Sequence, residues 1–545
     1  MSLFRINPSF RPRLFQCRSL ATALRNEEEY TSTPQYPPIL DLSFKKKLQR
    51  KKEAVHEEIK GVKTIEEKQI KLNMPRYYGF KSYPLTENYS PYDNLTLAQH
   101  ITKTHLIVNN NLPEFYKNID VDKLVTEMKS EIEEAILIEF DGYLRTHDFK
   151  KEDLSKTQKE DIISSSVATK INRILMNKLA TNHPHIGNAQ VDYDPRIEST
   201  WYVGGMIPPE HIKSCRRGME WMKPYENDPI DRVMVYFGSP SLTLRSTLPL
   251  QPIISQSEAQ NTDLKVPFFK FDPVSVGNYT DHRHIANIPG FWPGDPHQFG
   301  MLSYHKRGYI FERERYQDAQ DDKEALHRQG ILASFGWLQA QANFLGFNTF
   351  NDITYPLVTQ TIITSGKVWS FYTYQMNTIV LHSDNITENP TRNVCWATEE
   401  MNLFENIEND KIVGFNENVL SHLLKFYCNA PESRLGINLT PYLDNKEKCI
   451  ADYAEDEKRE WLEREYKYLV SNRPRFKPVY EIYSWEKIYK IDNKTRFMDK
   501  KLRPFELLQN PYKRRLDDRL ANYIPRKLRP DLPRWKGRYA KEYFP

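Results

Sequence analysis

Hydrophobic and polar positions follow two different periods between residues 331 and 431, the stretch of the chain richest in apolar residues. It opens with apolar residues at three- and four-residue steps, which predict one face of a helix. These residues are Leu332, Phe335, Leu338, Ala342 and Leu345. Two runs rich in β-branched and aromatic residues follow, 357–364 and 367–375, separated by Ser365-Gly366. Two such runs joined by a two-residue loop with Gly predict a β-hairpin, because tight turns need positive φ.

Three further amphipathic helices are predicted by the same spacing. The first is capped by Asp120 and carries Val121, Leu124, Met128, Ile132 and Ile136. The second carries Ile163, Val167, Ile171, Ile174 and Leu179. The third begins at Asn416 and carries Val419, Leu420, Leu423, Leu424 and Tyr427. We interpret the apolar stripes as core faces, although a groove for a partner helix would give the same pattern.

Short strands are predicted at 201–203, ending before Gly204-Gly205, at 232–237, ending before Gly238, and at 393–396. Strands, loops and a helix followed by a hairpin favour an α+β fold with a mainly antiparallel sheet and packed helices. A helical N-terminal region and an extended basic C-terminal tail complete the predicted architecture. Within these regions, basic residues predict a helix at 44–60, Thr64 with Glu67 predicts a capping box, and mixed charges predict a solvated helix at 454–470.

These patterns divide the 545 residues into five parts. The predicted parts are a mitochondrial presequence (1–26), an extended arm with basic helices (27–115), a helical region (116–200), an α+β core domain with the hairpin (201–431), and a charged helix with a basic Pro-rich extension (432–545). The chain contains 27 Phe, 32 Tyr and 9 Trp, enough for a substantial core. It contains 35 Pro against 20 Gly, which favours stiff, extended connections.

The first 26 residues predict a mitochondrial address. Five Arg and no acidic residue occur before Glu27, the composition of a mitochondrial presequence, although a basic tail would share it. The five Cys form no CxxC pair, as expected in a reducing compartment. Mean hydropathy of −0.69 and the lack of a long apolar run predict no membrane span.

Charge is distributed unevenly along the chain. Residues 501–545 hold thirteen Lys and Arg against five Asp and Glu. The two ends therefore carry +5 and +8, and the overall +5 leaves a net −8 for residues 27–500. An acidic body with a basic tail is typical of a tail that binds a partner.

The basic tail interleaves cations with aromatic rings, a pattern suited to phosphates and to stacking on bases. The predicted RNA-contacting residues are Lys513, Arg514, Arg515, Arg526, Lys527, Arg529, Arg534, Trp535, Lys536 and Arg538. A solvated linker or a segment that binds an acidic protein would show similar charge, and these alternatives stay open on composition alone.

Enzyme signatures are missing from the sequence: it contains no GxGxxG, no P-loop and no GxSxG. We predict no catalytic set, no metal and no cofactor. The remaining alternative is a zinc-dependent hydrolase built on His282, His284 and His297, with His183 and His185 upstream and Asp281 or Asp295 to orient the imidazoles.

Whole phrases of the chain resemble the programmed cell death protein 9 family of mitochondrial ribosomal proteins. They are ASFGWLQAQANFLGF (333–347), TYPLVTQTIITSGKVWSFYTYQMNTIVL (354–381), NPTRNVCWAT (389–398) and ENDKIVGFNENVL (408–420). The resemblance spans about residues 34–432. That family was first counted with the small subunit, as protein thirty, and is now placed in the large one.

The resemblance implies a structural protein of the mitochondrial large ribosomal subunit, bound to the ribosome in the matrix. It implies contacts with ribosomal RNA and with other large-subunit proteins, including a heterodimer with the related protein thirty-seven through the hairpin domain. A free mitochondrial RNA-binding factor is the alternative of a different class, since it would share the presequence and the tail.

Overall fold

The structure is a computed structural model that describes residues 80–87, 94–146, 154–218, 220, 222–283, 287–291, 295–311, 319–347, 352–409 and 411–441, with Ser43, Lys46, Arg50 and Ala54. The chain divides into two units, Met1–Lys52 and Glu53–Pro545. Lys46 and Arg50 in the first unit are helical, as is Ala54 at the start of the second. These three residues lie within the helix predicted at 44–60, whose other residues lie outside the described ones. The helices and strands below belong to the second unit.

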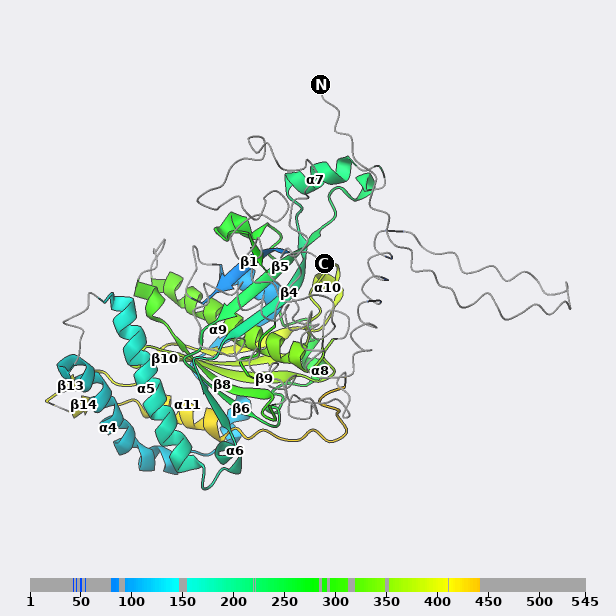
Figure 1. Cartoon of the computed structure of the whole chain (residues 1–545). Helices are drawn as coiled ribbons and strands as arrows, with labels where there is room; N and C mark the ends of the chain where they lie inside the picture. The colour runs from blue at the N-terminus through cyan, green and yellow to red at the C-terminus, as the bar shows by residue number, and fades with distance from the viewer. Residues whose placement is uncertain are drawn as a thin grey trace, which may run out of the picture. The chain divides into compact units, whose positions relative to one another are not determined.

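A large sheet of eight strands runs through the second unit (Figure 1). Its strand order is β2-β11-β10-β9-β8-β6-β3, and the short β12 pairs with β10. The strands are β2 (Thr104–Asn109), β3 (Gln190–Tyr193), β6 (Leu242–Ser246), β8 (Phe299–Lys306), β9 (Leu357–Thr364), β10 (Val368–Met376), β11 (Asn393–Thr398) and β12 (Met401–Asn402). β2 is parallel to β11 and β8 is parallel to β9, whereas the other pairs are antiparallel.

A second, smaller sheet has the order β4-β5-β1-β7. Its strands are β1 (Phe80–Thr86), β4 (Ile197–Met206), β5 (Ile230–Gly238) and β7 (Asp281–Arg283), and β1 is parallel to β5. A separate hairpin joins β13 (Asn406–Glu408) to β14 (Lys411–Val413). The fold is therefore α+β with mostly antiparallel strands, as the sequence predicts.

Helix α9 (Ala319–Phe344) contacts strands of both sheets. Its residues from 325 to 344 are buried on nearly every side, as expected for a helix enclosed between two layers. Two glycines allow this close approach. A Cβ added to Gly336 would lie 2.2 Å from the Tyr236 ring of β5, and one added to Gly330 would lie 2.5 Å from the Tyr372 ring of β10.

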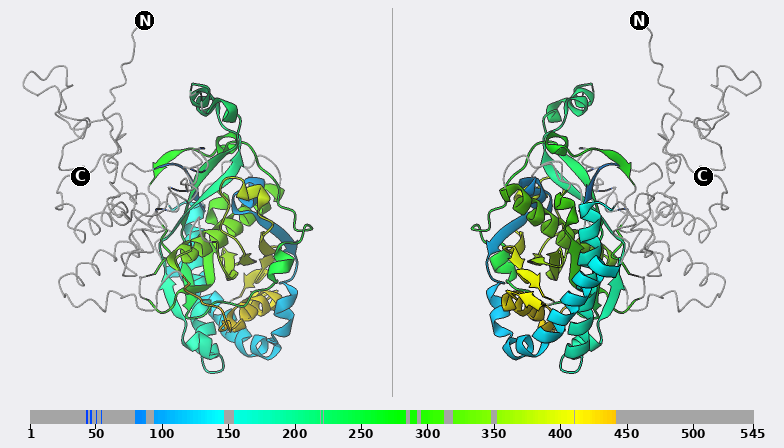
Figure 2. Two further views of the ribbon diagram at one scale, coloured as in Figure 1. Left: turned by 90° about the vertical axis from the view of Figure 1, so that its right-hand side faces the viewer. Right: turned by 90° about the vertical axis from the view of Figure 1, so that its left-hand side faces the viewer.

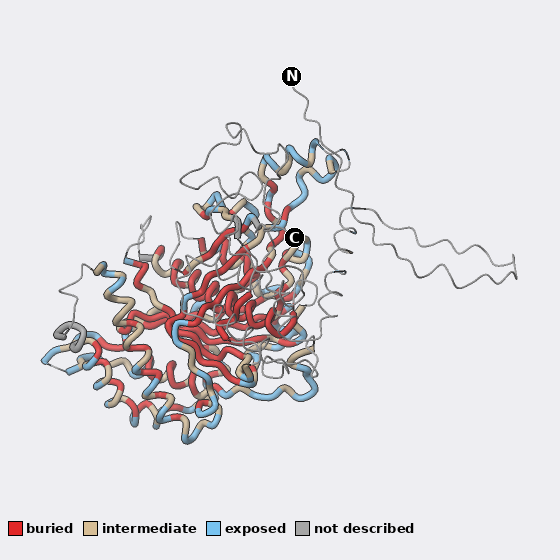
Figure 3. The backbone as a smooth tube through the Cα atoms, in the orientation of Figure 1, coloured by how far each residue is buried: buried red, intermediate tan, exposed pale blue. Residues whose placement is uncertain are grey.

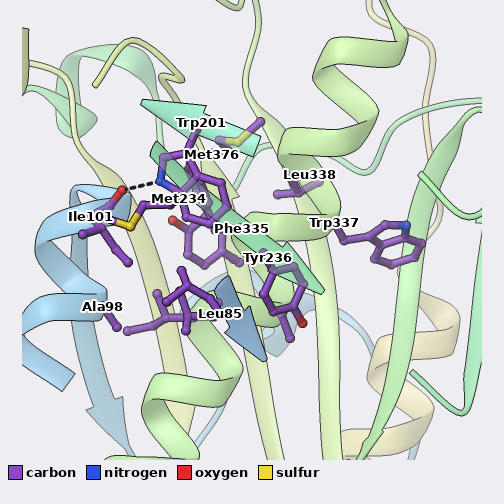
Figure 4. Packing of buried hydrophobic residues seen from close by; sticks show 14 of the residues in the cluster. Leu85, Ala98, Ile101, Trp201, Met234, Tyr236, Phe335, Trp337, Leu338 and Met376 are labelled. Carbon is purple, nitrogen blue, oxygen red and sulfur yellow. Dashed lines mark hydrogen bonds between the residues drawn. The ribbon is translucent and has the colours of Figure 1, made fainter. Parts of the chain in front are cut away.

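The first hydrophobic core surrounds α9 and extends to α3 (Leu95–Thr102). Trp201 of β4 packs edge-to-face on Phe335 of α9, with ring centroids 5.0 Å apart, and its Nε1–H donates to the Ile101 carbonyl at 2.8 Å (Figure 4). The Trp201 indole thus joins the smaller sheet to α9 and to α3.

The second hydrophobic core lies on the opposite face of the large sheet, under α4 (Asp122–Thr146), α5 (Lys156–Leu179) and α11 (Glu417–Cys428). Alternation along β10 shows the division: Trp369 and Phe371 enter this core, whereas Tyr372 and Tyr374 enter the first. Both faces of the sheet are covered, and its central strands are buried throughout nearly all of their length (Figures 2 and 3).

Short elements complete the described residues. The short helices are α6 (Pro184–Gly187), α7 (Glu210–Arg217), α8 (Gln256–Ala259) and α10 (Asn385–Glu388), and the 3-10 turns are η1 (Glu114–Asn118), η2 (Lys223–Tyr225), η3 (Pro273–Val276) and η4 (Gly308–Phe311). No helix in the described ranges has both the length and the apolarity needed to cross a bilayer.

The hairpin and the four amphipathic helices predicted between residues 120 and 431 are present. Ser365 N donates to the Val368 carbonyl at 3.1 Å, so the turn residues are Gly366 and Lys367, one position later than expected, with Gly366 at φ +86°. The Asn416 side chain caps α11 by accepting from Asn418 N at 3.0 Å. The five apolar residues predicted on α11 are all buried.

The strand predicted at 201–203 is longer than expected. β4 continues through Gly204-Gly205 to Met206, with a shift of register after Val203. Gly204 is needed because the Ser383 backbone lies against it, and an added Cβ would be 2.0 Å from the Ser383 oxygen. The two glycines therefore permit a close crossing and do not end the strand.

Candidate functional site

The predicted RNA-contacting residues from Lys513 to Arg538 lie outside the described residues, as does the helix predicted at 454–470. The predicted presequence and the capping box at Thr64 also lie outside them. The side-chain clusters and surfaces that the structure describes are those of the body, residues 80–441 with their gaps.

Of the three histidines of the hydrolase hypothesis, the structure describes the side chain of His297 alone. His282 lies on β7 opposite Lys81, and His284 lies outside the described residues. His297 contacts Asp295 through Nδ1 at 3.2 Å and the Asn188 carbonyl through Nε2 at 2.9 Å. Both ring nitrogens of His297 thus contact protein groups. Across the described residues, no three His, Cys, Asp or Glu side chains gather closely enough to hold a metal ion.

His183 and His185 join α6 to the end of α11. His185 Nε2 lies 2.8 Å from the Tyr427 carbonyl, and His183 Nε2 lies 3.6 Å from the Cys428 sulfur. Burial lowers the pKa of both histidines and raises the pKa of the Cys428 thiol to about 11. Both partners of the Cys428–His183 contact are therefore neutral near pH 7, and the thiol is not an activated nucleophile.

A buried Ser-His-Glu arrangement links the two sheets. Glu87, just after β1, lies 2.9 Å from His305 Nδ1 on β8, and His305 Nε2 lies 3.1 Å from the Ser303 hydroxyl. Glu87 also accepts from the Tyr236 hydroxyl at 2.8 Å and from Ser239 N. This is the order of contacts found in serine hydrolases, where an acid orients the His that activates the Ser.

We call Glu87, His305 and Ser303 the Glu87 centre. Burial and charge indicate that this centre has a structural role. Ser303, His305 and Glu87 are 1%, 2% and 3% exposed, so a substrate carbonyl could not reach the Ser303 oxygen in this structure. Burial opposes ionisation of Glu87, but His305 and the donors around the carboxylate lower its pKa to about 2. A charged carboxylate that receives these contacts ties β1, β5 and β8 together. The sequence offers one signal for it, Ser303 and His305 two residues apart on one face of a strand.

A second buried charge stabilises the opposite edge of the large sheet. Arg245 of β6 is paired with Asp192 of β3 and with Asp295, at 3.1 Å for the latter. Its guanidinium also lies 4.5 Å from the centroid of the Phe291 ring. The pKa of Asp295 is lowered: burial opposes this, but the charge and hydrogen bond of Arg245 prevail. His297 and Asp295, which the sequence marks as metal candidates, therefore belong to a structural ion-pair cluster.

An apolar strip is exposed on the loop that follows α8. Phe268, Phe271, Val274 and Tyr279 are each between 50% and 55% exposed. The loop is fixed to the smaller sheet, because Asp272 accepts hydrogen bonds from Tyr83 of β1 and Arg232 of β5. Asp272 also accepts one from Val274 N within the loop. We call these four side chains the apolar strip. Exposed apolar side chains on a fixed backbone are typical of a protein-binding surface.

The chain between β4 and β5, residues 207–229, forms a polar arm next to the strip. Ile207 N donates to the Lys270 carbonyl at 2.8 Å, which joins the two surfaces. No residue of α7 is buried. The arm is ordered by its own contacts, since Arg216 Nη1 donates to the carbonyls of Tyr225 and Asp228 at 2.8 and 2.6 Å. Ile212 of α7, which is partly buried, packs against the first core and fixes the arm to the body.

The comparisons with known proteins agree on a ribosomal relationship. The family model described as mitochondrial 28S ribosomal protein S30 (PDCD9) matches residues 3–431. Large ribosomal subunit protein mL37 of Bos taurus is 29% identical over 171 residues, and that of Rattus norvegicus is 27% identical over 171. The Gallus gallus protein is 24% identical over 173 residues. Each match covers 31% of this chain and 38% of the relative, so the chain spans well under half the length of these relatives.

Proposed function

This chain belongs to the family described as mitochondrial 28S ribosomal protein S30 (PDCD9), and from that premise we propose that it is a structural constituent of the mitochondrial large ribosomal subunit. The observation that carries the proposal is the match of the family model over residues 3–431, which includes both sheets and both cores. The role is to support mitochondrial translation by architecture, not by catalysis.

Two observations favour the large subunit and a non-catalytic role. The relatives with partial similarity are named large ribosomal subunit proteins, whereas the family description names the 28S particle. In the body, the buried Ser303 of the Glu87 centre is closed to substrate. The proposal therefore assigns the chain to the large subunit and gives the Glu87 centre a structural task.

We infer the partners from the charge of the chain and from its family. The basic tail, with its thirteen Lys and Arg, lies on mitochondrial ribosomal RNA. The core domain, residues 201–431, docks on other ribosomal proteins and pairs with the related protein mL37 as a heterodimer. The apolar strip supports this docking, because its half-exposed side chains lie on a loop fixed by Asp272. The presequence directs the chain to the matrix, where it stays bound to the ribosome.

The first test is sedimentation of the tagged full-length protein in a sucrose gradient at physiological salt. Co-migration with the large subunit is expected. A slow pool that binds RNA would favour the free RNA-binding factor, and migration with the small subunit would follow the older family description. Bound zinc in the purified protein, measured by elemental analysis, would revive the hydrolase hypothesis.

The second test concerns the heterodimer. Replacing Phe268, Phe271 and Val274 of the strip with Ser is expected to reduce recovery of mL37 with the tagged chain, because three exposed apolar side chains leave the interface. Tyr193→Ser is the matched control, since Tyr193 is 52% exposed on a distant strand. Equal recovery with all variants would remove the strip from the interface.

A further inference from the structure

Strand β2 lies at one edge of the large sheet, with β11 as its partner. The two strands stay in register without interruption from Thr104 to Asn109. Asn393 N donates to the Lys103 carbonyl at 3.0 Å and Glu399 N to the Asn109 carbonyl at 3.2 Å. In a parallel ladder the backbone N–H and C=O groups of every second residue point to the same side of the strand. The N–H and C=O groups of Thr104, Leu106 and Val108 therefore point away from β11.

These outward backbone groups have no hydrogen-bond partner among the described residues. Thr104 is buried at the start of the strand, but Leu106 is only partly buried and Val108 is 38% exposed. The groups of Leu106 and Val108 are thus open to another chain. An unpaired row of this kind is a template for a further strand.

The opposite edge of the same sheet is protected in ways that β2 is not. Strand β3 has four residues, and it carries Asp192, which is paired with the buried Arg245. The Val191 carbonyl accepts from the Gln190 side chain at 3.3 Å. Short length, a charge on the edge and a satisfied carbonyl all discourage strand addition. β2 has six residues, THLIVN, without Pro, bulge or acidic side chain.

The outer edge of the smaller sheet is also covered. On β4, Gly204 N donates to the Leu381 carbonyl at 2.9 Å, and the Glu198 backbone bridges to Ile288. Within the described ranges, β2 therefore differs from both β3 and β4 in leaving an apolar edge without a partner or a protective charge.

We propose that the β2 edge binds an extended segment of a neighbouring protein, which adds a strand to the large sheet by backbone hydrogen bonds. The bound segment has apolar residues at alternate positions, because one face of its strand must cover Leu106 and Val108. This inference rests on the proposed function for the complex in which the partner is met. It concerns a protein partner, since unpaired strand groups recognise another backbone and not a phosphate.

A photocrosslink identifies what lies on this edge. The full-length chain is expressed in cells with photoreactive benzoylphenylalanine in place of Val108, or in place of Tyr193 on the opposite edge as the control, and the complex that contains it is irradiated. The expected result is a crosslink from position 108 to a different protein that position 193 does not give. A crosslink to the same chain, to a second copy or to RNA, or no crosslink, would overturn the proposal.

Proline provides the matching functional test. Val108→Pro removes an outward N–H that makes no bond within the described chain, and an edge strand tolerates Pro there. We expect an unchanged melting temperature and about five- to tenfold weaker retention in the complex, the effect of losing about one hydrogen bond. Ile107→Pro is the control, because its N–H points to β11 and its loss should lower the melting temperature.

A second variant at the same position separates loss of binding from loss of folding. If Val108→Pro itself lowers the melting temperature, Val108→Lys replaces it, since a charge on the edge blocks strand addition while leaving the ladder to β11 intact. Wild-type retention by a folded variant of either kind refutes the edge as a binding site. Failure of the wild-type chain to sediment with the large subunit would instead refute the proposed function, and the crosslink would still report on the edge.

Discussion

The glycines of α9 give the most direct test of how the two sheets are held together. In a helix exposed to solvent, Gly→Ala stabilises by about 1 kcal/mol, because Ala has the higher helix propensity. At Gly336 we expect the opposite sign. An added Cβ would lie 2.2 Å from Cδ1 and 2.9 Å from Cγ of Tyr236, whereas carbon atoms in contact prefer about 3.5–4.0 Å.

The expected loss of stability depends on how far the Tyr236 ring must move and on the contacts it loses. The clash is near the root of the ring, and the side chain is 1% exposed, so rotation at the tip cannot relieve it. Overpacking of this kind costs about 1–3 kcal/mol. Displacing the ring also weakens its 2.8 Å hydrogen bond to Glu87, which adds about 1.5–3 kcal/mol. After the gain in propensity is subtracted, Gly336→Ala should destabilise by roughly 1.5–5 kcal/mol.

The assay is urea unfolding of the purified chain followed by Trp fluorescence, with the midpoint and slope compared between variants. Gly218→Ala is the matched control, since an added Cβ at Gly218 would meet only ordinary contacts at 3.6 Å. Its midpoint should stay unchanged or rise. If Gly336→Ala is as stable as the wild type or more so, the close approach of α9 to β5 does not limit the packing and the reasoning fails.

Three other predictions test the carboxylate, the cap and the tail. Because the pKa of Glu87 is lowered from 4.5 to about 2 on folding, its charge stabilises the fold above about pH 4.5, and this contribution is lost as the pH falls toward 2. Glu87→Gln should therefore lower the urea midpoint at pH 7 and flatten its decline between pH 5 and pH 3; an unchanged profile would contradict the assignment. Asn416→Ala should cost about 1 kcal/mol, because α11 loses the acceptor for Asn418 N, and amide exchange in α11 should quicken; full protection would refute the cap. Neutralising four tail cations should make the dependence of RNA affinity on salt shallower by about one unit for each phosphate that is no longer neutralised, as measured by filter binding, and an unaltered slope would mean that they touch no phosphate. These four are Arg514, Arg515, Arg526 and Lys527.

Local signals explain which elements the sequence can predict. The hairpin β9–β10 and helix α11 depend on neighbours a few residues away, such as Gly366 in the turn and Asn416 at the cap. For helix α9 the spacing predicts a single apolar face, but the helix is buried on nearly every side by two sheets. Its Gln and Ser residues are accommodated by bonds that no periodicity reveals, such as Gly300 N to Gln341 at 2.9 Å.

Long-range pairing explains what the sequence cannot predict. The local pattern predicts no strand at β1 or β2, because their partners β5 and β11 lie far along the chain. Pro84 also argues against a strand, yet it lies beyond Phe80–Ser82, the residues of β1 that pair with β7. The Glu87 centre escapes sequence reasoning for the same cause, since only folding brings Glu87 beside Ser303 and His305.

The place of β1 and β2 in the sheets sets the order in which this protein can be made. Both strands leave the synthesising ribosome early, but β2 has no partner until residues 393–398 have emerged. At about 5–20 residues per second, that delay is roughly 15 to 60 seconds. β1 can complete its sheet once β7 (Asp281–Arg283) has emerged, but β2 must wait for the whole delay, and Leu106 to Val108 stay open to wrong pairing. Such a chain must be kept from aggregating until nearly all of its body has been synthesised. A fragment that ends before Thr398 should not fold.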